Sequence, residues 1–73
     1  MNRIINFGEL CRNWRKRNGI TIRTIANDLN LDFSTVYKFE RNNRASFVIL
    51  SWYVDHGLDL TFEYTRDMWS ENQ

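Results

Sequence analysis

Apolar residues recur every three or four positions along much of the chain and divide it into short segments. In residues 7–17 this spacing places them on one face of an amphipathic helix, which Asn18 and Gly19 are suited to end. That face consists of Phe7, Leu10, Cys11 and Trp14. Residues 46–56 repeat the spacing before Gly57, so the pattern predicts a helix there as well. Its apolar side is predicted at Phe47, Leu50 and Val54, with Ile49 and Tyr53 as further candidates.

Two short helices joined by a tight turn are predicted over residues 21–42. Thr21 suits the N-cap of the first helix, because its hydroxyl can accept a hydrogen bond from the first turn. Asn30 suits the turn, since asparagine adopts the left-handed conformation more readily than other residues with a side chain. Asp32 is an N-cap candidate for the second helix. The small Ala26 allows the helices to cross closely, and the apolar wedge between them is predicted at Ile25, Leu29, Leu31, Val36 and Phe39.

The hydrophobic period changes after Gly57. Residues 58–65 read Leu-Asp-Leu-Thr-Phe-Glu-Tyr-Thr, an alternation typical of a half-buried β-strand. A fifth helix is the alternative, but the alternation and the β-favouring residue types favour the strand. A lone strand has nothing to pair with inside a helical domain, so we expect it to pair with a second copy. The sequence therefore predicts a compact all-α domain of four to five helices that ends in a C-terminal strand used for dimerisation.

Composition limits the protein to a small single domain. The chain has 73 residues, 42% of them hydrophobic, which is enough to build a compact core. The single cysteine, Cys11, has no disulfide partner and no second cysteine with which to hold a metal. No apolar run approaches the ~20 residues that a membrane span needs. We expect a cytoplasmic protein without metal or cofactor.

The net charge of +1 hides an uneven distribution of charges. Residues 1–44 contain nine of the ten basic residues but four of the nine acidic ones, so the remainder of the chain is acidic. A basic first part and an acidic last part suggest one surface for a polyanion and another turned away from it. Ordinary solvated helix surface is the alternative.

Four stretches of the sequence carry a resemblance to a known family. They are Gly-Ile-Thr (19–21), Ile-Ala-Asn-Asp-Leu (25–29), Ser-Thr-Val-Tyr-Lys-Phe-Glu-Arg-Asn (34–42) and Gly-Leu-Asp-Leu (57–60). Together they resemble the Cro/repressor-type helix-turn-helix family, also called xenobiotic-response-element-like. The resemblance implies a helical domain that binds operator DNA as a dimer, with its third helix in the major groove. It also implies a structural ion pair between Arg15 and Glu40.

Three positions depart from the family's pattern. Ile22 stands where the family often has a glutamine that bonds to a phosphate, and Asn30 replaces the usual glycine of the turn. Asp32 places a carboxylate close to where phosphates would lie, which should weaken attachment to DNA.

The candidate DNA contacts follow from the resemblance and from the outward face of the third helix. Lys38 is expected to bond to guanine O6 or N7. Phe33 is expected either to press against a thymine methyl or to cover the wedge between the two short helices. Arg41, Asn43 and Arg44 are expected to bind phosphates. The full set is Arg23, Phe33, Ser34, Thr35, Tyr37, Lys38, Arg41, Asn43 and Arg44. The alternative for this face is ordinary solvated surface.

The last third of the chain is rich in aromatic residues, which a small domain has difficulty burying. We therefore expect a homodimer formed through the fourth helix and the following segment. The predicted dimer contacts are Trp52, Tyr53, Leu58, Leu60, Phe62 and Tyr64.

The sequence as a whole indicates residues 1–57 as a helix-turn-helix DNA-binding domain, and residues 58–73 as a dimerisation or partner-binding segment. We expect a small dimeric transcriptional repressor of a bacterium, phage or mobile element, binding a palindromic operator in double-stranded DNA and associated with the nucleoid when bound. The alternatives are a protein-interaction module on the same scaffold, such as an antirepressor or inhibitor, and an antitoxin that holds a toxin through its C-terminal third. No glycine-rich phosphate loop or nucleophile–base set is evident, so we do not expect an enzyme.

Overall fold

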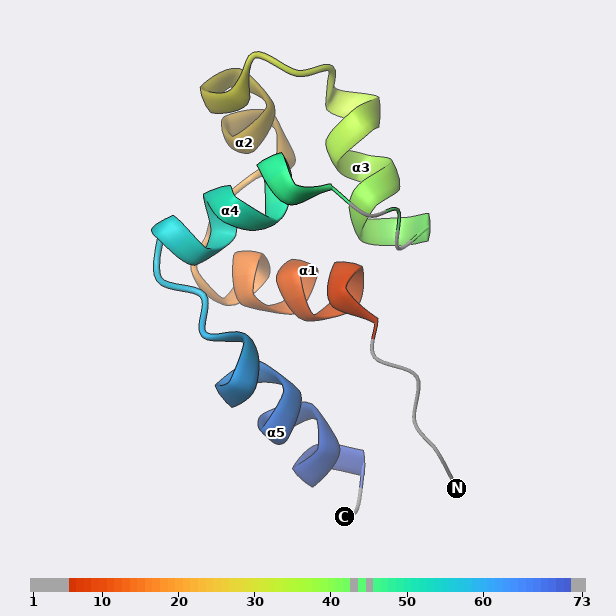
Figure 1. The fold of residues 1–73 in the computed structure, drawn as a ribbon, viewed down its shortest axis with the longest axis vertical. Coiled ribbons are helices and arrows are strands. Elements are labelled where there is room, and N and C mark those ends of the chain that lie inside the picture. Colours follow the sequence, from red (N-terminus) through yellow and green to blue (C-terminus); the bar gives the residue numbers. More distant parts are fainter. Residues whose placement is uncertain (1–5, 43, 45, 72–73) are drawn as a thin grey trace.

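The computed structural model describes the backbone of residues 6–42, 44 and 46–71 and, of these, the side chains up to Arg66. The described residues form five helices and no strand (Figure 1). The helices are α1 (Phe7–Arg17), α2 (Ile22–Leu29), α3 (Phe33–Asn42), α4 (Phe47–Asp55) and α5 (Leu60–Glu71). The prediction of a compact all-α domain is confirmed.

The helices pack around α1 and α4. Helix α1 contacts α3 and α5, while α2 contacts α3 and α4. In Figure 1, α2 and α3 lie at one end of the molecule, and α5 extends from the other end, on the far side of α1. Helix α3 therefore has one side against the domain and one side turned outward.

The helix boundaries follow the local signals in the sequence. The Asn6 side chain accepts from the Glu9 N–H at 2.9 Å, and Thr21 accepts from the Thr24 N–H at 3.2 Å. Asn30 adopts the left-handed conformation, with φ of 55°, and closes α2 as predicted. These local signals fix the starts of α1 and α2 and the end of α2.

Tyr53 occupies the centre of the core. Its ring meets those of Trp14 and Trp52 edge-on, with centroids 5.7 and 5.4 Å apart, and stacks on Phe39 at 6.3 Å. The buried hydrophobic residues are Leu10, Cys11, Trp14, Ile25, Ala26, Val36, Phe39, Ile49, Trp52, Tyr53 and Leu58. Every one of α1 to α4 contributes to this cluster.

The predicted C-terminal strand is wrong, because Leu60–Glu71 forms helix α5. A helix satisfies its own backbone hydrogen bonds, whereas a lone strand in this domain would leave them unpaired. The Asp59 carboxylate accepts from the Phe62 N–H at 3.0 Å and starts the helix. The alternating pattern predicts Glu63 on the outer side, but it is buried and ion-paired with Arg17 of α1.

Two predictions about α4 are also corrected. Ile49, Trp52 and Tyr53 face the core, whereas Phe47 and Val54 are exposed. As a result Trp52 and Tyr53 are buried within a single chain and cannot form a dimer surface in this fold. The same holds for Leu58, which lies in the loop between α4 and α5 and is also buried. Of the remaining dimer candidates, Leu60 packs against the core, Tyr64 is half-buried and Phe62 is exposed.

Burial of Cys11 makes stability sensitive to alkaline pH. Burial, followed by the nearby Glu40 and Glu63 charges, raises the pKa of the Cys11 thiol from 9.0 to about 12. The folded chain therefore holds this proton where the unfolded chain releases it, so stability is full below pH 9 and falls as the pH approaches 12. We expect the free energy of unfolding to fall by up to about 1.4 kcal/mol per pH unit in that range.

Urea unfolding of the chain and of Cys11→Ala at a series of pH values checks this expectation. Between pH 9 and 10 the variant should lose stability less steeply. Burial and Glu40 also raise the pKa of Tyr53, so a shared decline is expected above pH 10. Equal slopes below pH 10 would show that Cys11 is not responsible.

Candidate nucleic-acid interface

A buried ion pair fixes α3 to α1. The Arg15 guanidinium donates from Nε to Glu40 Oε2 at 2.8 Å and from Nη2 to Oε1 at 3.0 Å. Arg15 Nη1 also donates to the Ile20 carbonyl at 2.9 Å, and the Tyr53 hydroxyl donates to Glu40 Oε2. The expected pair is confirmed, and its two parallel hydrogen bonds attach the last turn of α3 to α1.

Burial and the Glu40 carboxylate shift the pKa values of Arg15 and Tyr53. Burial acts to lower the pKa of Arg15, but the hydrogen bonds and charge of Glu40 outweigh it, and the pKa lies above its ordinary value. The pKa of Tyr53 is raised by burial and by Glu40. Arg15 is therefore charged and Tyr53 is a neutral donor at physiological pH.

Close packing at Gly8 adds a second anchor for α3. A Cβ built on Gly8 would lie 2.5 Å from the carbonyl oxygens of both Phe39 and Glu40. The first turn of α1 thus lies directly against the backbone of α3. The sequence gives no local signal for this contact, because the glycine stands inside a helical pattern and meets residues more than thirty positions away.

The side of α3 opposite these anchors is exposed. Val36, Phe39 and Glu40 are buried, which turns the rest of the helix outward. Apart from the terminal Asn42, the exposed residues are Phe33, Ser34, Thr35, Tyr37, Lys38 and Arg41, and we call these six the α3 face. The predicted orientation of this helix is confirmed.

Three side chains of the α3 face, Phe33, Tyr37 and Arg41, contact one another in a row. The rings of Phe33 and Tyr37 stack with centroids 6.2 Å apart and planes at 21°. The Arg41 guanidinium lies over the Tyr37 ring, 5.5 Å from its centroid. Phe33 is 50% exposed, so half of its surface is accessible to a ligand. These contacts limit the freedom of the three side chains in the free protein.

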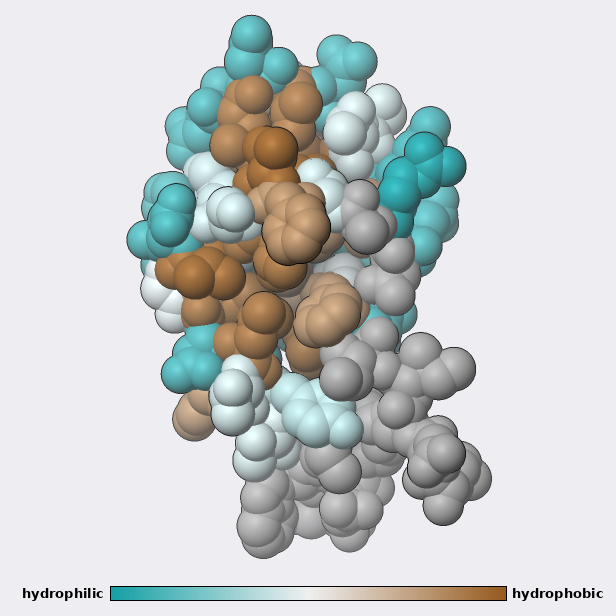
Figure 2. Space-filling view, in the orientation of Figure 1, coloured by the Kyte–Doolittle hydropathy of each residue, from teal (hydrophilic) through white to brown (hydrophobic). Residues whose placement is uncertain are grey.

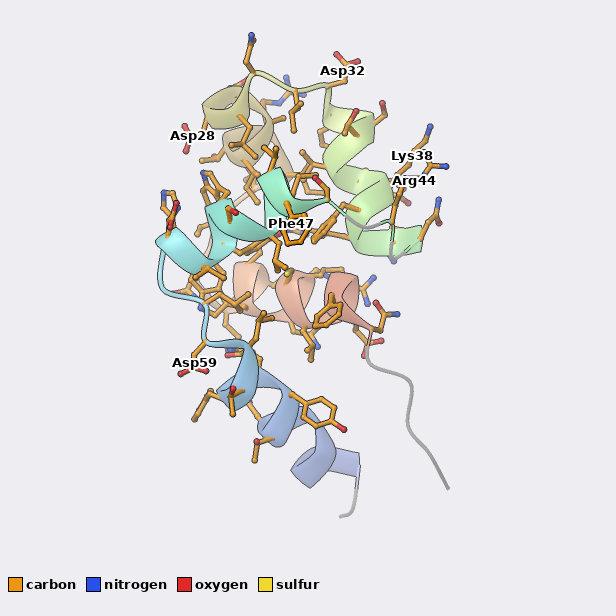
Figure 3. The ribbon with its side chains drawn as sticks, viewed as in Figure 1. Asp28, Asp32, Lys38, Arg44, Phe47 and Asp59 are labelled. Carbon is orange, nitrogen blue, oxygen red and sulfur yellow. The ribbon has the colours of Figure 1, made fainter. Side chains whose placement is uncertain are left out.

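Two further predicted contacts, Arg23 and Arg44, lie outside α3. Arg23 is exposed on α2, and Arg44 is exposed between α3 and α4. Figure 3 shows Lys38 and Arg44 projecting from the same side of the molecule, with Asp32 at the opposite, N-terminal end of α3. Asn43 lies outside the described residues.

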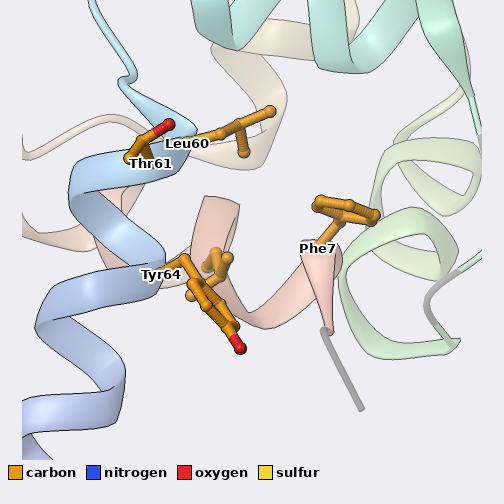
Figure 4. A pocket seen from close by; sticks show the side chains of 5 residues that line it. Phe7, Leu60, Thr61 and Tyr64 are labelled. Atoms are coloured by element: carbon orange, nitrogen blue, oxygen red, sulfur yellow. The ribbon is translucent and has the colours of Figure 1, made fainter. Parts of the chain in front are cut away.

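A pocket elsewhere in the molecule is apolar. It has a volume of about 220 Å³ and is lined by Phe7, Leu10, Leu60, Thr61 and Tyr64, between α1 and α5 (Figure 4). None of these side chains carries a charge. No group of three or more His, Cys, Asp or Glu side chains suited to a metal ion occurs among the described residues. Within the same part of the chain, no helix is long and apolar enough to cross a membrane.

Comparison with known proteins gives no match that bears on these features. No protein-family model matches the sequence, and the searches of curated proteins and of solved structures find no match.

Proposed function

We propose that this chain binds DNA sequence-specifically by placing α3 in the major groove, and that it acts as a transcriptional regulator. The observation that carries the proposal is the α3 face, where polar, aromatic and cationic side chains are exposed together on a helix whose other side is fixed. Helices α2 and α3, joined at Asn30, then act as a helix-turn-helix.

The dimensions of α3 suit the groove. An α-helix with its side chains is about 10–12 Å in diameter, and the major groove is about 12 Å wide. Helix α2 packs across α3 and would lie over the DNA backbone in such a complex. The Arg15–Glu40 pair and the Gly8 contact hold α3 rigid, which lowers the entropy cost of binding.

Each outward side chain has a chemical role in this arrangement. Lys38 donates to guanine O6 or N7, and the Ser34 and Thr35 hydroxyls reach bases or phosphates near the start of the helix. Phe33 offers an apolar surface to a thymine methyl, which its exposed position supports. Arg41, held over Tyr37, presents its guanidinium to a phosphate with less freedom to lose.

Selection of bound duplexes from a randomised pool tests the proposal. At about 0.15 M salt, non-specific attraction to phosphates is weak, so enrichment reports sequence reading. We expect a defined sequence to be enriched by the full chain. A pool that stays random after repeated rounds would contradict the proposal and would favour the protein-interaction alternatives.

Lys38→Ala is expected to weaken binding to the selected duplex by about 1–3 kcal/mol and to relax the preference at one base pair. The physical reason is loss of a charged donor that reaches a base edge from the middle of α3. Fluorescence anisotropy with the selected duplex and its single-base variants measures both effects. Lys16→Ala is the matched control, since Lys16 is an exposed lysine at the end of α1. Equal affinities for the two variants would remove Lys38 from the site.

A further inference from the structure

The outer side of α4 is apolar and exposed. Phe47 is 88% exposed, Val48 56% and Val54 47%. Ser51 is exposed between them and Leu50 is half-buried at the edge. We call Phe47, Val48, Leu50, Ser51 and Val54 the α4 face. The opposite side of the same helix, with Ile49, Trp52 and Tyr53, fills the core, and Leu50 packs against the core at its edge. The exposed residues Phe47, Val48 and Val54 are not among those that form or cover the core.

The α4 face belongs to a broader apolar surface. Figure 2 shows apolar residues gathered over α4 and continuing across α1 on the same side of the molecule. Figure 3 places Phe47 in the middle of that side. Contiguous exposed apolar surface of this kind marks a site of association.

The charges at its borders indicate which molecule covers it. The stretch from Ser46 to Val54 contains no charged residue. Arg44 precedes it and Asp55 follows it, and both are exposed. In Figure 3, Arg44 lies on one side of Phe47, whereas Asp28 and Asp59 lie on the other side. The surface therefore has a basic border, an apolar centre and an acidic border.

We propose that the α4 face binds the α4 face of a second copy of this chain, with the two helices antiparallel about a two-fold axis. That arrangement sets the Arg44 border of each copy beside the Asp55 border of the other, whereas a parallel arrangement would place like charges together. It brings Phe47 of one copy toward Val54 of the other, and the small Ser51 lets the helices approach. The surface is thus complementary to itself, as a two-fold interface requires.

The expected dimer is concentration-dependent. A helix of nine residues is about 13.5 Å long, so its contact is smaller than the roughly 800 Å² per partner of a typical stable interface. The proposal does not depend on DNA binding. If both proposals hold, the two-fold axis presents two α3 faces to one duplex and the selected sequence contains a two-fold repeat.

Sedimentation velocity of the full chain between about 10 µM and 1 mM tests the interface without DNA. We expect the wild-type sedimentation coefficient to rise with concentration toward that of a dimer. Phe47→Glu should raise the dissociation constant at least about tenfold, since it places a carboxylate in the apolar centre. Val54→Lys provides a second disruption of the same face at its other end. Circular dichroism verifies that both variants keep their helices.

Phe62→Glu is the matched control, because Phe62 is an exposed aromatic on α5. Its dimerisation should be unchanged. A wild-type chain that stays monomeric throughout, variants at Phe47 and Val54 that dimerise normally, or a dimer disrupted as strongly by Phe62→Glu would each overturn the α4 interface.

Charge reversal tests the antiparallel arrangement. Arg44→Glu and Asp55→Arg should each weaken the dimer, and the double variant should recover most of the loss because the reversed charges again meet. A double variant as weak as the two single changes combined would overturn the antiparallel pairing.

Discussion

Replacing Glu40 with glutamine is expected to destabilise the chain by about 3–5 kcal/mol. The Arg15 guanidinium would remain buried at the α1–α3 contact without a negative charge beside it, and glutamine can accept only part of its hydrogen bonding. A domain of this size has a total stability of only several kcal/mol, so the variant should be largely unfolded at 37 °C. Urea and thermal unfolding followed by circular dichroism measure the loss.

Asp55→Asn is the control for this substitution. It also replaces a carboxylate with the corresponding amide, but Asp55 is exposed, so its effect on the monomer, measured at a concentration below that of any dimer, should stay within about 0.5 kcal/mol. If both variants lose the same small amount, the Arg15–Glu40 pair does not carry the stability assigned to it.

The Glu40 variant also tests whether Glu40 affects DNA binding only through the stability of the fold. Glu40 lies on the buried side of α3, away from Lys38. At a low temperature where the variant is still folded, DNA affinity corrected for the folded fraction should therefore be close to that of the wild type. Loss of affinity in the fully folded variant would mean that the pair sets the orientation of the α3 face as well as its stability.

Local signals in the sequence were sufficient for the first three helices. Thr21 and Asn30 act on backbone groups within a few residues, so their roles do not depend on the rest of the fold. The outward side of α3 was predictable for a similar reason. Its buried residues, Val36 and Phe39, stand at helical spacing and leave the polar positions on the other side.

The side of α4 that faces the core was not predictable from its pattern. The helix is apolar on both sides, so periodicity does not distinguish the Phe47 side from the Tyr53 side. Contacts with Trp14 and Phe39, distant in the sequence, decide the matter by surrounding the Tyr53 ring. The surplus of aromatic residues was real, but tertiary packing determines which of them are exposed.

The pattern of residues 58–65 predicts a strand because an acidic residue such as Glu63 is normally expected on the surface, whereas here it is buried. Leu60, Glu63 and Tyr64 have the spacing of one helical face, yet Glu63 made the segment look alternating. Its carboxylate is accommodated by Arg17, a partner 46 positions away that no local pattern could supply. Once Glu63 is counted as a buried residue, the helical period of α5 is apparent.

Gly8→Ala is expected to destabilise the chain by about 2–3 kcal/mol, although alanine favours a helix over glycine by about 1 kcal/mol. The new methyl group would lie 2.5 Å from the carbonyl oxygens of Phe39 and Glu40. These are backbone atoms of a helix, so they cannot move aside as a flexible side chain would. Helices α1 and α3 would have to separate, which weakens the Arg15–Glu40 hydrogen bonds beside them.

Gly19→Ala separates this steric effect from the general cost of replacing a glycine. A Cβ on Gly19 meets nothing within 4 Å, but its φ of +67° strains any residue with a side chain. We expect a loss of about 1–2 kcal/mol from the backbone alone. Urea unfolding should therefore place Gly8→Ala below Gly19→Ala in stability. Helix propensity alone predicts the reverse order, so a Gly8→Ala variant as stable as the wild type would show that α1 does not cross α3 at this glycine.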